Sequence, residues 1–281
     1  MEFEHLAGVG CRVEAALARD LGARLPDGMP ARHSELIRRQ VQRTAEHLDG
    51  VPWLSEDAAS SAARAQAGPV RVYLVRHAES TGNQEQRLLG VRIHGALTPL
   101  GQAQSRRTAD YLSSAFRDLR DAKVLLVSSP VGRALETARP IGARLGCPVS
   151  SEPNLAELDI GDWTGKYFSE LEADPAYRQW MQDKWFCAPP GGESMFEVRT
   201  RACEALAGLV LQARRTGSVL IVVTHFFPLM AIFDVVMLGT NIRPDNSSIS
   251  CFDYAAGHWS SSFINSTAHL GEDGAKPVGY V

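Results

Sequence analysis

From residue 70 onward, short β-branched runs alternate with amphipathic helical stretches, and this alternation restricts the fold more than any other feature. Strands are predicted at 70–75 (VRVYLV), 123–128 (KVLLVS) and 219–224 (VLIVVT), and helices at 100–119, 132–145 and 193–215. Apolar runs of this kind suit a mostly parallel sheet that is covered on both faces. We therefore predict an α/β fold with three α/β/α layers, and two further strands near 248–254 and 259–264 are typical of a hairpin.

The first 68 residues follow a different pattern. Two helices are predicted at 4–25 and 31–48, broken by the sequence PDGMP, and a small, polar stretch at 55–68 is typical of a linker. This part contains no catalytic constellation. We therefore predict a helical extension and linker over 1–68, which serves packing or homodimer formation, followed by a catalytic domain over 69–281.

Composition excludes several classes of protein. A net charge of −3 gives no basic surface for nucleic acid. Five scattered cysteines without a Cys-x-x-Cys pair argue against a disulfide framework and a zinc site, and they favour a reducing cytoplasm. The stretch 218–239 is long enough to cross a bilayer, but it would place His225 and Asp234 at hydrocarbon depth. We interpret it as a buried strand followed by a buried helix from about Pro228, and we expect no membrane partner.

Two histidines and two arginines follow predicted strands directly. His77 comes after the first strand with Arg76 beside it, Arg133 starts the helix after the second strand, and His225 follows the third. Ligands bind at the carboxyl ends of parallel strands, so these side chains should meet in one pocket. Guanidinium groups suit phosphate oxygens, and a histidine can act as base or nucleophile. The pattern predicts a positive pocket for a phosphate dianion, without the carboxylate cluster that a metal would need.

Several separate motifs resemble the histidine phosphatase superfamily, the group that includes cofactor-dependent phosphoglycerate mutase. They are RHAESTGN (76–83), LTPLGQA (97–103), SPVGRA (129–134), LAELDIGDWTG (155–165), PGGES (190–194) and NSTAHL (265–270). The likeness runs from about residue 70 to 270 and is greatest to the broad-specificity and alpha-ribazole-type phosphatases. The resemblance implies that His77 becomes phosphorylated, that Arg76, Asn83, Arg133 and a protonated His225 hold the phosphoryl oxygens, and that Glu157 donates a proton.

These implications leave alternatives open. Glu79, Asp159 and Asp162 are rival carboxylates for the acid, and Asn83 could simply cap a helix. Phe226 stands where the family usually has glycine, and a Cβ there would limit a positive φ and hence a backbone contact to phosphate. The expected function is hydrolysis of a small phosphate monoester without metal or other cofactor. A phosphoglycerate-mutase-like phosphotransferase and an inactive scaffold that binds phospho-ligands are the alternatives.

Overall fold

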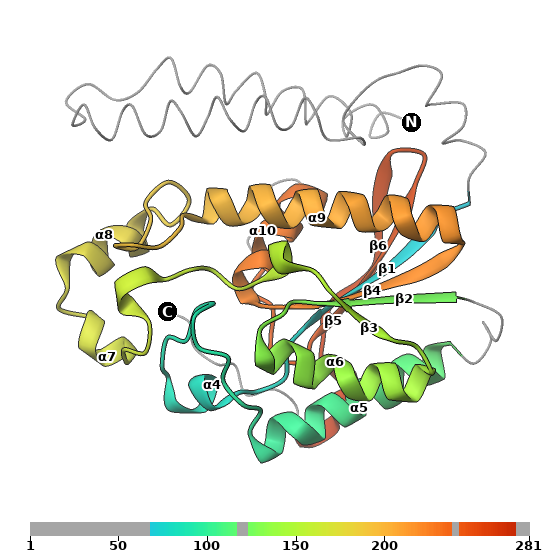
Figure 1. Ribbon diagram of the computed structural model, residues 1–281, viewed down its shortest axis with the longest axis horizontal. Coiled ribbons are helices and arrows are strands. Elements are labelled where there is room, and N and C mark those ends of the chain that lie inside the picture. Colours follow the sequence, from blue (N-terminus) through green and yellow to red (C-terminus); the bar gives the residue numbers. More distant parts are fainter. Residues whose placement is uncertain (1–67, 117–122, 238–241, 274–281) are drawn as a thin grey trace. The chain divides into compact units, whose positions relative to one another are not determined.

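The computed structural model describes residues 68–116, 123–237 and 242–273 (Figure 1). The predicted N-terminal helices and most of the linker lie outside these residues. The described chain forms a sheet of six strands with helices on both of its faces. Within the described ranges, no helix combines the length and the hydropathy that crossing a bilayer requires.

The sheet is mostly parallel, as predicted. Its strands lie in the order β3-β2-β4-β1-β5-β6. The parallel part consists of β1 (Val70–Arg76), β2 (Lys123–Ser128), β3 (Val149–Ser151) and β4 (Ser218–Thr224). The predicted hairpin is present as β5 (Ile249–Ala255) and β6 (His258–Ser266), and β5 pairs with β1 in the antiparallel sense. The start of β5 therefore lies at the same edge of the sheet as the carboxyl end of β1.

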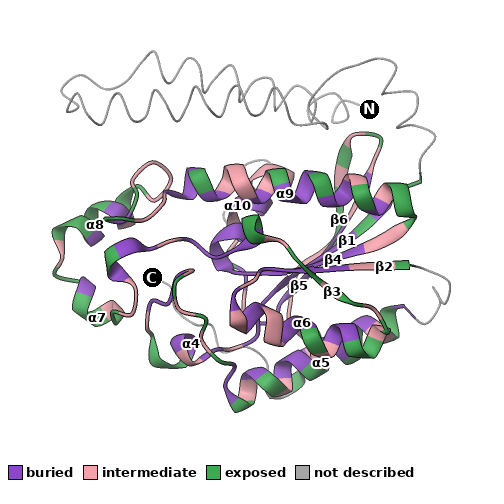
Figure 2. Ribbon diagram, viewed as in Figure 1, coloured by how far each residue is buried: buried purple, intermediate pink, exposed green. Residues whose placement is uncertain are grey.

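Helices cover the two faces of the sheet, and each covering layer has its own core. On one face, α5 (Pro99–Ala115) and α6 (Gly132–Leu145) pack against β1 through side chains such as Leu112, Ile141 and Val75. On the other face lie α9 (Met195–Thr216) and α10 (Phe226–Val236). Figure 2 shows the central strands mostly buried and the outer surfaces of the helices exposed, as the amphipathic patterns predict, whereas the edge strands β3 and β6 are partly exposed.

Short elements fill the long connections, and the sequence did not predict them. They are the helices α4 (Thr81–Glu85), α7 (Phe168–Leu171) and α8 (Pro175–Gln182) and the 3-10 turns η2 (Pro153–Leu155), η3 (Gly161–Trp163) and η4 (Ala268–Asp273). Segments of three to eight residues are too short to show a helical period. A second core, which includes Trp163, Trp180 and Phe227, holds the segment between η3 and α9 onto the domain.

Two predicted helix starts shift by two residues, and both shifts have a local cause. Helix α9 begins at Met195 because Ser194 caps it, accepting from Glu197 N while Glu197 bonds back to Ser194. Helix α10 begins at Phe226 rather than near Pro228, because a proline is tolerated in the first turn, where the N–H groups need no helical partner.

Candidate active site

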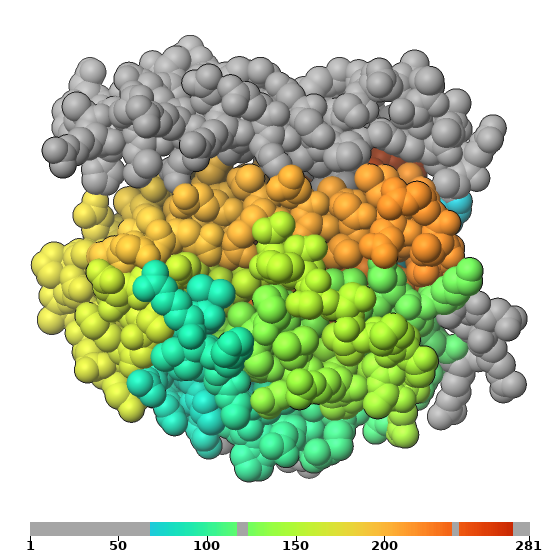
Figure 3. All heavy atoms as spheres, in the orientation of Figure 1, coloured from blue at the N-terminus to red at the C-terminus, as the bar shows by residue number. Residues whose placement is uncertain are grey.

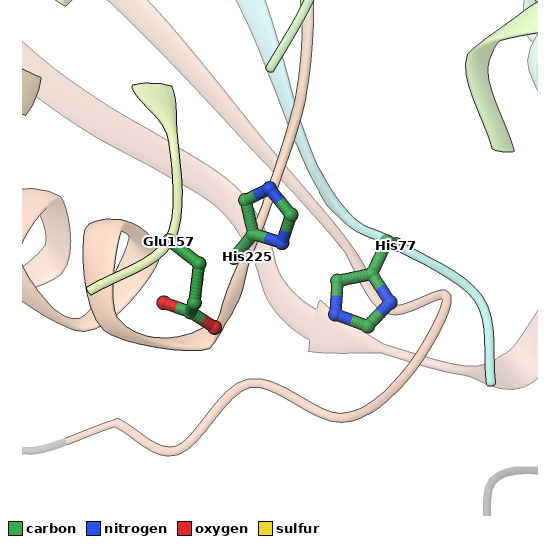
Figure 4. Close-up of side chains that lie close together, drawn as sticks. All are labelled: His77, Glu157 and His225. Carbon is green, nitrogen blue, oxygen red and sulfur yellow. The ribbon is translucent and has the colours of Figure 1, made fainter. Parts of the chain in front are cut away.

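The proposed site residues emerge at one edge of the sheet, where three parallel strands end. In the register of the sheet Arg76 pairs with Thr224, and Ser128 pairs with Val223. The residues that follow stay tied to these ends, since His77 N donates to Thr224 O and Ser129 N donates to Val223 O, both at 2.9 Å. Figure 4 shows the side chains of His77 and His225 pointing toward a common space that Glu157 enters from a third segment.

Two hydrogen bonds select the tautomer of His77. Its Nδ1 lies 2.7 Å from the carbonyl oxygen of Ala78, which can only accept, so Nδ1 carries the proton. Its Nε2 accepts from Arg133 Nε at 3.2 Å and therefore carries a lone pair. Burial lowers the pKa of His77 well below its ordinary value, and the charges of Arg133 and Arg76 lower it further. These effects favour a neutral ring whose lone pair lies on Nε2.

Four hydrogen bonds hold the Arg133 guanidinium in place. It donates to the carbonyl oxygens of Gly90, Ile93 and His94 at 2.9, 3.1 and 3.3 Å, as well as to His77. Arg76 donates to Pro244 O at 2.8 Å and lies with Cζ 5.1 Å from the centre of the Phe226 ring. Both arginines are buried. Fixed guanidinium groups of this kind provide charge stabilisation that needs no reorganisation during a reaction.

His225 is completely buried between strand β4 and helix α10. Its Nε2 lies 2.7 Å from Ser129 Oγ, and its Nδ1 has no hydrogen-bond partner among the described residues. Burial, followed by the charge of Arg133, lowers the pKa of His225 well below its ordinary value. Burial and the nearby charge therefore oppose the protonation of His225 that the family resemblance implies. A neutral ring that accepts the Ser129 proton at Nε2 would present Nδ1–H to an anion.

Glu157 is the carboxyl group that the fold brings beside the two histidines. One ligand atom from each of the three residues lies within 4.8 Å of the others. Oε1 of Glu157 accepts from the backbone N–H of Leu158 at 3.0 Å and of Phe227 at 3.2 Å. Burial raises the pKa of Glu157, although Arg133 and the hydrogen bonds act in the opposite direction. The carboxyl group is therefore suited to hold and release a proton.

The rival carboxylates are engaged elsewhere. Glu79 accepts from Thr98 Oγ1 at 2.6 Å, and Asp159 forms an ion pair with Arg92 at 2.9 Å. Asp162 is exposed to solvent. Glu157 is thus the one carboxylate of these four that the geometry places with both histidines.

An ion pair that sequence reasoning missed fixes the Glu157 backbone. Arg201 on α9 donates to the carbonyl oxygens of Asn154, Ala156 and Glu157 at 2.8, 2.7 and 3.1 Å. Its charge is paired with Glu193, 2.7 Å away, and Glu193 also accepts from Asp159 N at 2.9 Å. The PGGES motif therefore holds the segment that carries Glu157. The available signal was an acid and a base eight residues apart, with Glu193 just before α9 and Arg201 within it. Nothing in the local sequence marked the carbonyl groups to which Arg201 donates.

Asn83 both caps a helix and borders the pocket. Its Oδ1 accepts from the backbone N–H and the hydroxyl of Ser80 at 3.0 and 2.9 Å, closing the first turn of α4. The pocket is lined by Asn83, Arg133 and Glu157 together with an apolar wall that includes Leu89, Ile160 and Phe227. On the face seen in Figure 3, the segment after β1 lies against the segment around Lys166, to which Leu88 N donates at 2.9 Å.

The site suits an anion better than a metal ion. His77, Glu157 and His225 supply the atom types that bind transition metals. However, Arg133 and Arg76 are close enough to lower the pKa of both histidines, and these fixed positive charges oppose a cation.

Comparison with known proteins identifies the family. The model of the histidine phosphatase superfamily (branch 1) matches residues 72–267. The chain belongs to this superfamily. A bifunctional protein of Mycobacterium tuberculosis is 30% identical over 214 residues, covering 73% of this chain and 56% of its own length. A probable phosphoglycerate mutase of Salmonella paratyphi C is 30% identical over 200 residues, covering 69% of this chain and 89% of its own. The chain thus spans about half the length of the first of these two relatives.

Relatives named as phosphatases also have solved structures. A glucosyl-3-phosphoglycerate phosphatase of Mycolicibacterium vanbaalenii is 34% identical over 149 residues, covering 53% of this chain and 63% of its own length. A mycobacterial glucosyl-3-phosphoglycerate phosphatase superposes with a TM-score of 0.61 at 25% identity, covering 71% of this chain and 100% of its own. The alpha-ribazole phosphatase of Shigella flexneri superposes with a TM-score of 0.62 at 23% identity over 70% of this chain and 96% of its own, which supports the fold alone.

Proposed function

We propose that this protein hydrolyses a small-molecule phosphate monoester through a phosphohistidine formed on His77. The observation that carries the proposal is the tautomer of His77, whose Nε2 lone pair is directed at Arg133 while Nδ1 is tied to Ala78 O. A nucleophile that is neutral, buried and next to two guanidinium groups is arranged for attack on a bound phosphate dianion.

The steps follow from the groups present. His77 Nε2 attacks phosphorus in line while Glu157 gives its proton to the departing alcohol oxygen. As the N–P bond forms, the Nε–H of Arg133 loses its acceptor on His77 and becomes available to donate to a phosphoryl oxygen without movement of the guanidinium. Arg76, Asn83 and His225 hold the remaining oxygens. Water then attacks phosphorus, Glu157 accepts its proton, and inorganic phosphate leaves with His77 restored.

Substrate chemistry is proposed at the level of a small phosphate ester. The relatives named above include phosphatases of glucosyl-3-phosphoglycerate and a probable phosphoglycerate mutase. A phosphate-release screen should therefore combine phosphorylated sugars, phosphoglycerates and nucleotide-derived esters. Transfer of phosphoryl between phosphoglycerate positions, without release of inorganic phosphate, would instead support the mutase alternative.

The intermediate itself can be trapped. Phosphohistidine survives at high pH, so quenching in base after mixing with radiolabelled substrate should leave label on the peptide that contains His77. His77→Ala should abolish label and turnover, and the control His258→Ala, at an exposed histidine, should keep both. Full activity in His77→Ala, or label on His225 instead of His77, would overturn this mechanism. Binding of phosphate without any turnover in the unaltered protein would instead support the phospho-ligand scaffold.

A further inference from the structure

Asn246 is a buried carboxamide beside the site that no motif or strand-end pattern marked. It is 2% exposed and lies in the segment that leads into β5. Its Nδ2 donates to the carbonyl oxygen of His77 at 3.0 Å and to Asn83 Oδ1 at 3.1 Å. One amide group therefore joins the backbone of the proposed nucleophile to the side chain of a proposed phosphate ligand.

The orientation of this amide has only one acceptable form. Both neighbours of Nδ2 are acceptors, so a flipped amide would place Asn246 Oδ1 against two oxygens. In the observed orientation Oδ1 is buried and has no hydrogen-bond partner among the described residues. A buried acceptor without a partner costs stability. The role of Asn246 is therefore to be sought in its two donations rather than in its oxygen.

The donation from Asn246 supports the orientation of the Asn83 side chain that Ser80 also favours. Oδ1 of Asn83 receives three donors, namely the N–H and the hydroxyl of Ser80 and the Nδ2 of Asn246. With the oxygen surrounded in this way, the amide nitrogen is the end that Asn83 presents to the pocket it lines. An N–H group there can donate to a phosphoryl oxygen, whereas an exposed Oδ1 would repel it.

We infer that Asn246 is a positioning residue, which holds the Asn83 carboxamide with its N–H group toward the phosphoryl oxygens and couples this orientation to the His77 backbone. The inference rests on the proposed function, since it concerns how that site binds phosphate. It assigns Asn246 no contact with substrate.

The competing explanation is that Asn246 only keeps its loop in shape, and the chain offers a matched control for it. Asn265 holds the same loop from the other side, since its Oδ1 accepts from Asp245 N at 2.8 Å and its Nδ2 donates to Arg243 O at 3.2 Å. His77 also keeps a second donor to its carbonyl oxygen, the N–H of Ser247 at 3.2 Å. Loss of Asn246 should therefore leave the nucleophile itself in place.

The test is a double-mutant cycle on the binding of inorganic phosphate, measured by calorimetry. Asn83→Ala and Asn246→Ala should each weaken phosphate binding about tenfold, the loss expected for one hydrogen bond to a charged group. The double variant should be no weaker than Asn83→Ala by more than about twofold, because both changes remove the same donation. Asn265→Ala should leave phosphate affinity unchanged. Asn246→Ser provides a second, smaller change if the alanine variant does not fold.

Three results would overturn the inference. Losses that multiply to about a hundredfold in the double variant would show that Asn246 acts independently of Asn83. An unchanged phosphate affinity in a folded Asn246 variant would show that Asn246 does not position Asn83. An equal loss of affinity in Asn265→Ala would show that Asn246 only maintains the shape of its loop. Calorimetry needs no turnover, so these results are separate from a failure to trap phosphohistidine on His77.

Discussion

Glu157→Gln separates proton donation from hydrogen-bonded support. Oε1 of Glu157 already accepts from two backbone N–H groups, at 3.0 and 3.2 Å, so the second oxygen is the one that can carry a proton to the substrate. Glutamine keeps an oxygen for those two donors and nearly the same volume. It cannot release a proton to a leaving group, so the geometry should survive while the acid is lost.

The size of the effect depends on the leaving group. An alkoxide that leaves a sugar phosphate has a conjugate acid with a pKa of about 14–16 and needs a proton, whereas nitrophenolate, at about 7, does not. A general acid contributes a factor on the order of 10²–10⁴, which corresponds to about 2.7–5.4 kcal/mol in the barrier. Steady-state kinetics of Glu157→Gln should therefore show that loss with an alkyl phosphate and a far smaller one with nitrophenyl phosphate.

The pKa of Glu157 gives two further readouts. Because burial raises it and the protonated form is the active acid, activity should fall as pH rises through this raised value, and the alkyl-ester profile of the variant should lack that alkaline limb. The folded state also binds this proton more tightly than the unfolded chain, in which the pKa of the Glu157 carboxyl has its ordinary value of 4.5. The contribution of this group to stability is thus full below 4.5 and is lost at higher pH. Glu157→Gln should raise the Tm at neutral pH and bring little gain below 4.5.

Equal losses on both esters would refute proton donation. That result would make Glu157 a positioning group and return Glu79 and Asp159 to consideration. Asp162→Asn, which changes an exposed carboxylate in the same motif, is the matched control and should leave both activities unchanged.

Four other changes probe separate parts of the site and its support. Ser129→Ala removes the hydroxyl 2.7 Å from His225 Nε2 and should lower kcat/KM by about 10- to 100-fold, with a changed pH profile, whereas Ser129→Thr should restore part of it. Gly101→Ala places a Cβ 1.9 Å from Glu79 O and should cost about 1–3 kcal/mol in chemical denaturation. Burial lowers the pKa of His269 to about 4, so stability should fall as pH drops from 6.5 toward 4, and His269→Gln should flatten that part of the Tm profile. Treatment with a chelator should change phosphatase activity by less than about twofold, since arginines rather than a metal hold the phosphate.

The sheet and the ends of its strands could be predicted because their signals are local. Continuous β-branched runs mark β1, β2 and β4, and a parallel sheet brings the ends of all three to one edge. His77 and His225 follow two of those ends directly, so their positions could be predicted from the strand boundaries alone. Arg133 comes a few residues after the end of β2, at the start of α6, and the same reasoning places it near the two histidines. Helix α6 has the bounds that were expected.

The residues that hold the site in place, Arg201 and Asn246, could not be predicted, because their contacts join distant parts of the chain. Arg201 bonds to carbonyl oxygens 44 to 47 residues away, and Asn246 lies 163 residues from Asn83. A carbonyl group carries no residue-specific signal, so no pattern indicates that it will receive an arginine. One topological signal for Asn246 was present. It stands shortly before the first strand of a predicted hairpin, and a strand antiparallel to β1 must begin at the edge where β1 ends.

Phe226 shows how a departure from the family pattern can be accommodated. Glycine is needed after the second histidine only if the backbone there has a positive φ or if a Cβ would collide with the ligand. Here Phe226 is the first residue of α10 and is not among the described residues with positive φ. Its ring turns away from the helix onto the guanidinium of Arg76, at 5.1 Å, and meets Phe227 edge to face. A cation over an aromatic face is stabilised and is shielded from water. The Phe226 ring therefore packs on Arg76 and is not part of the pocket lining, so the residue that stands where the family usually has glycine is compatible with the proposed phosphate site.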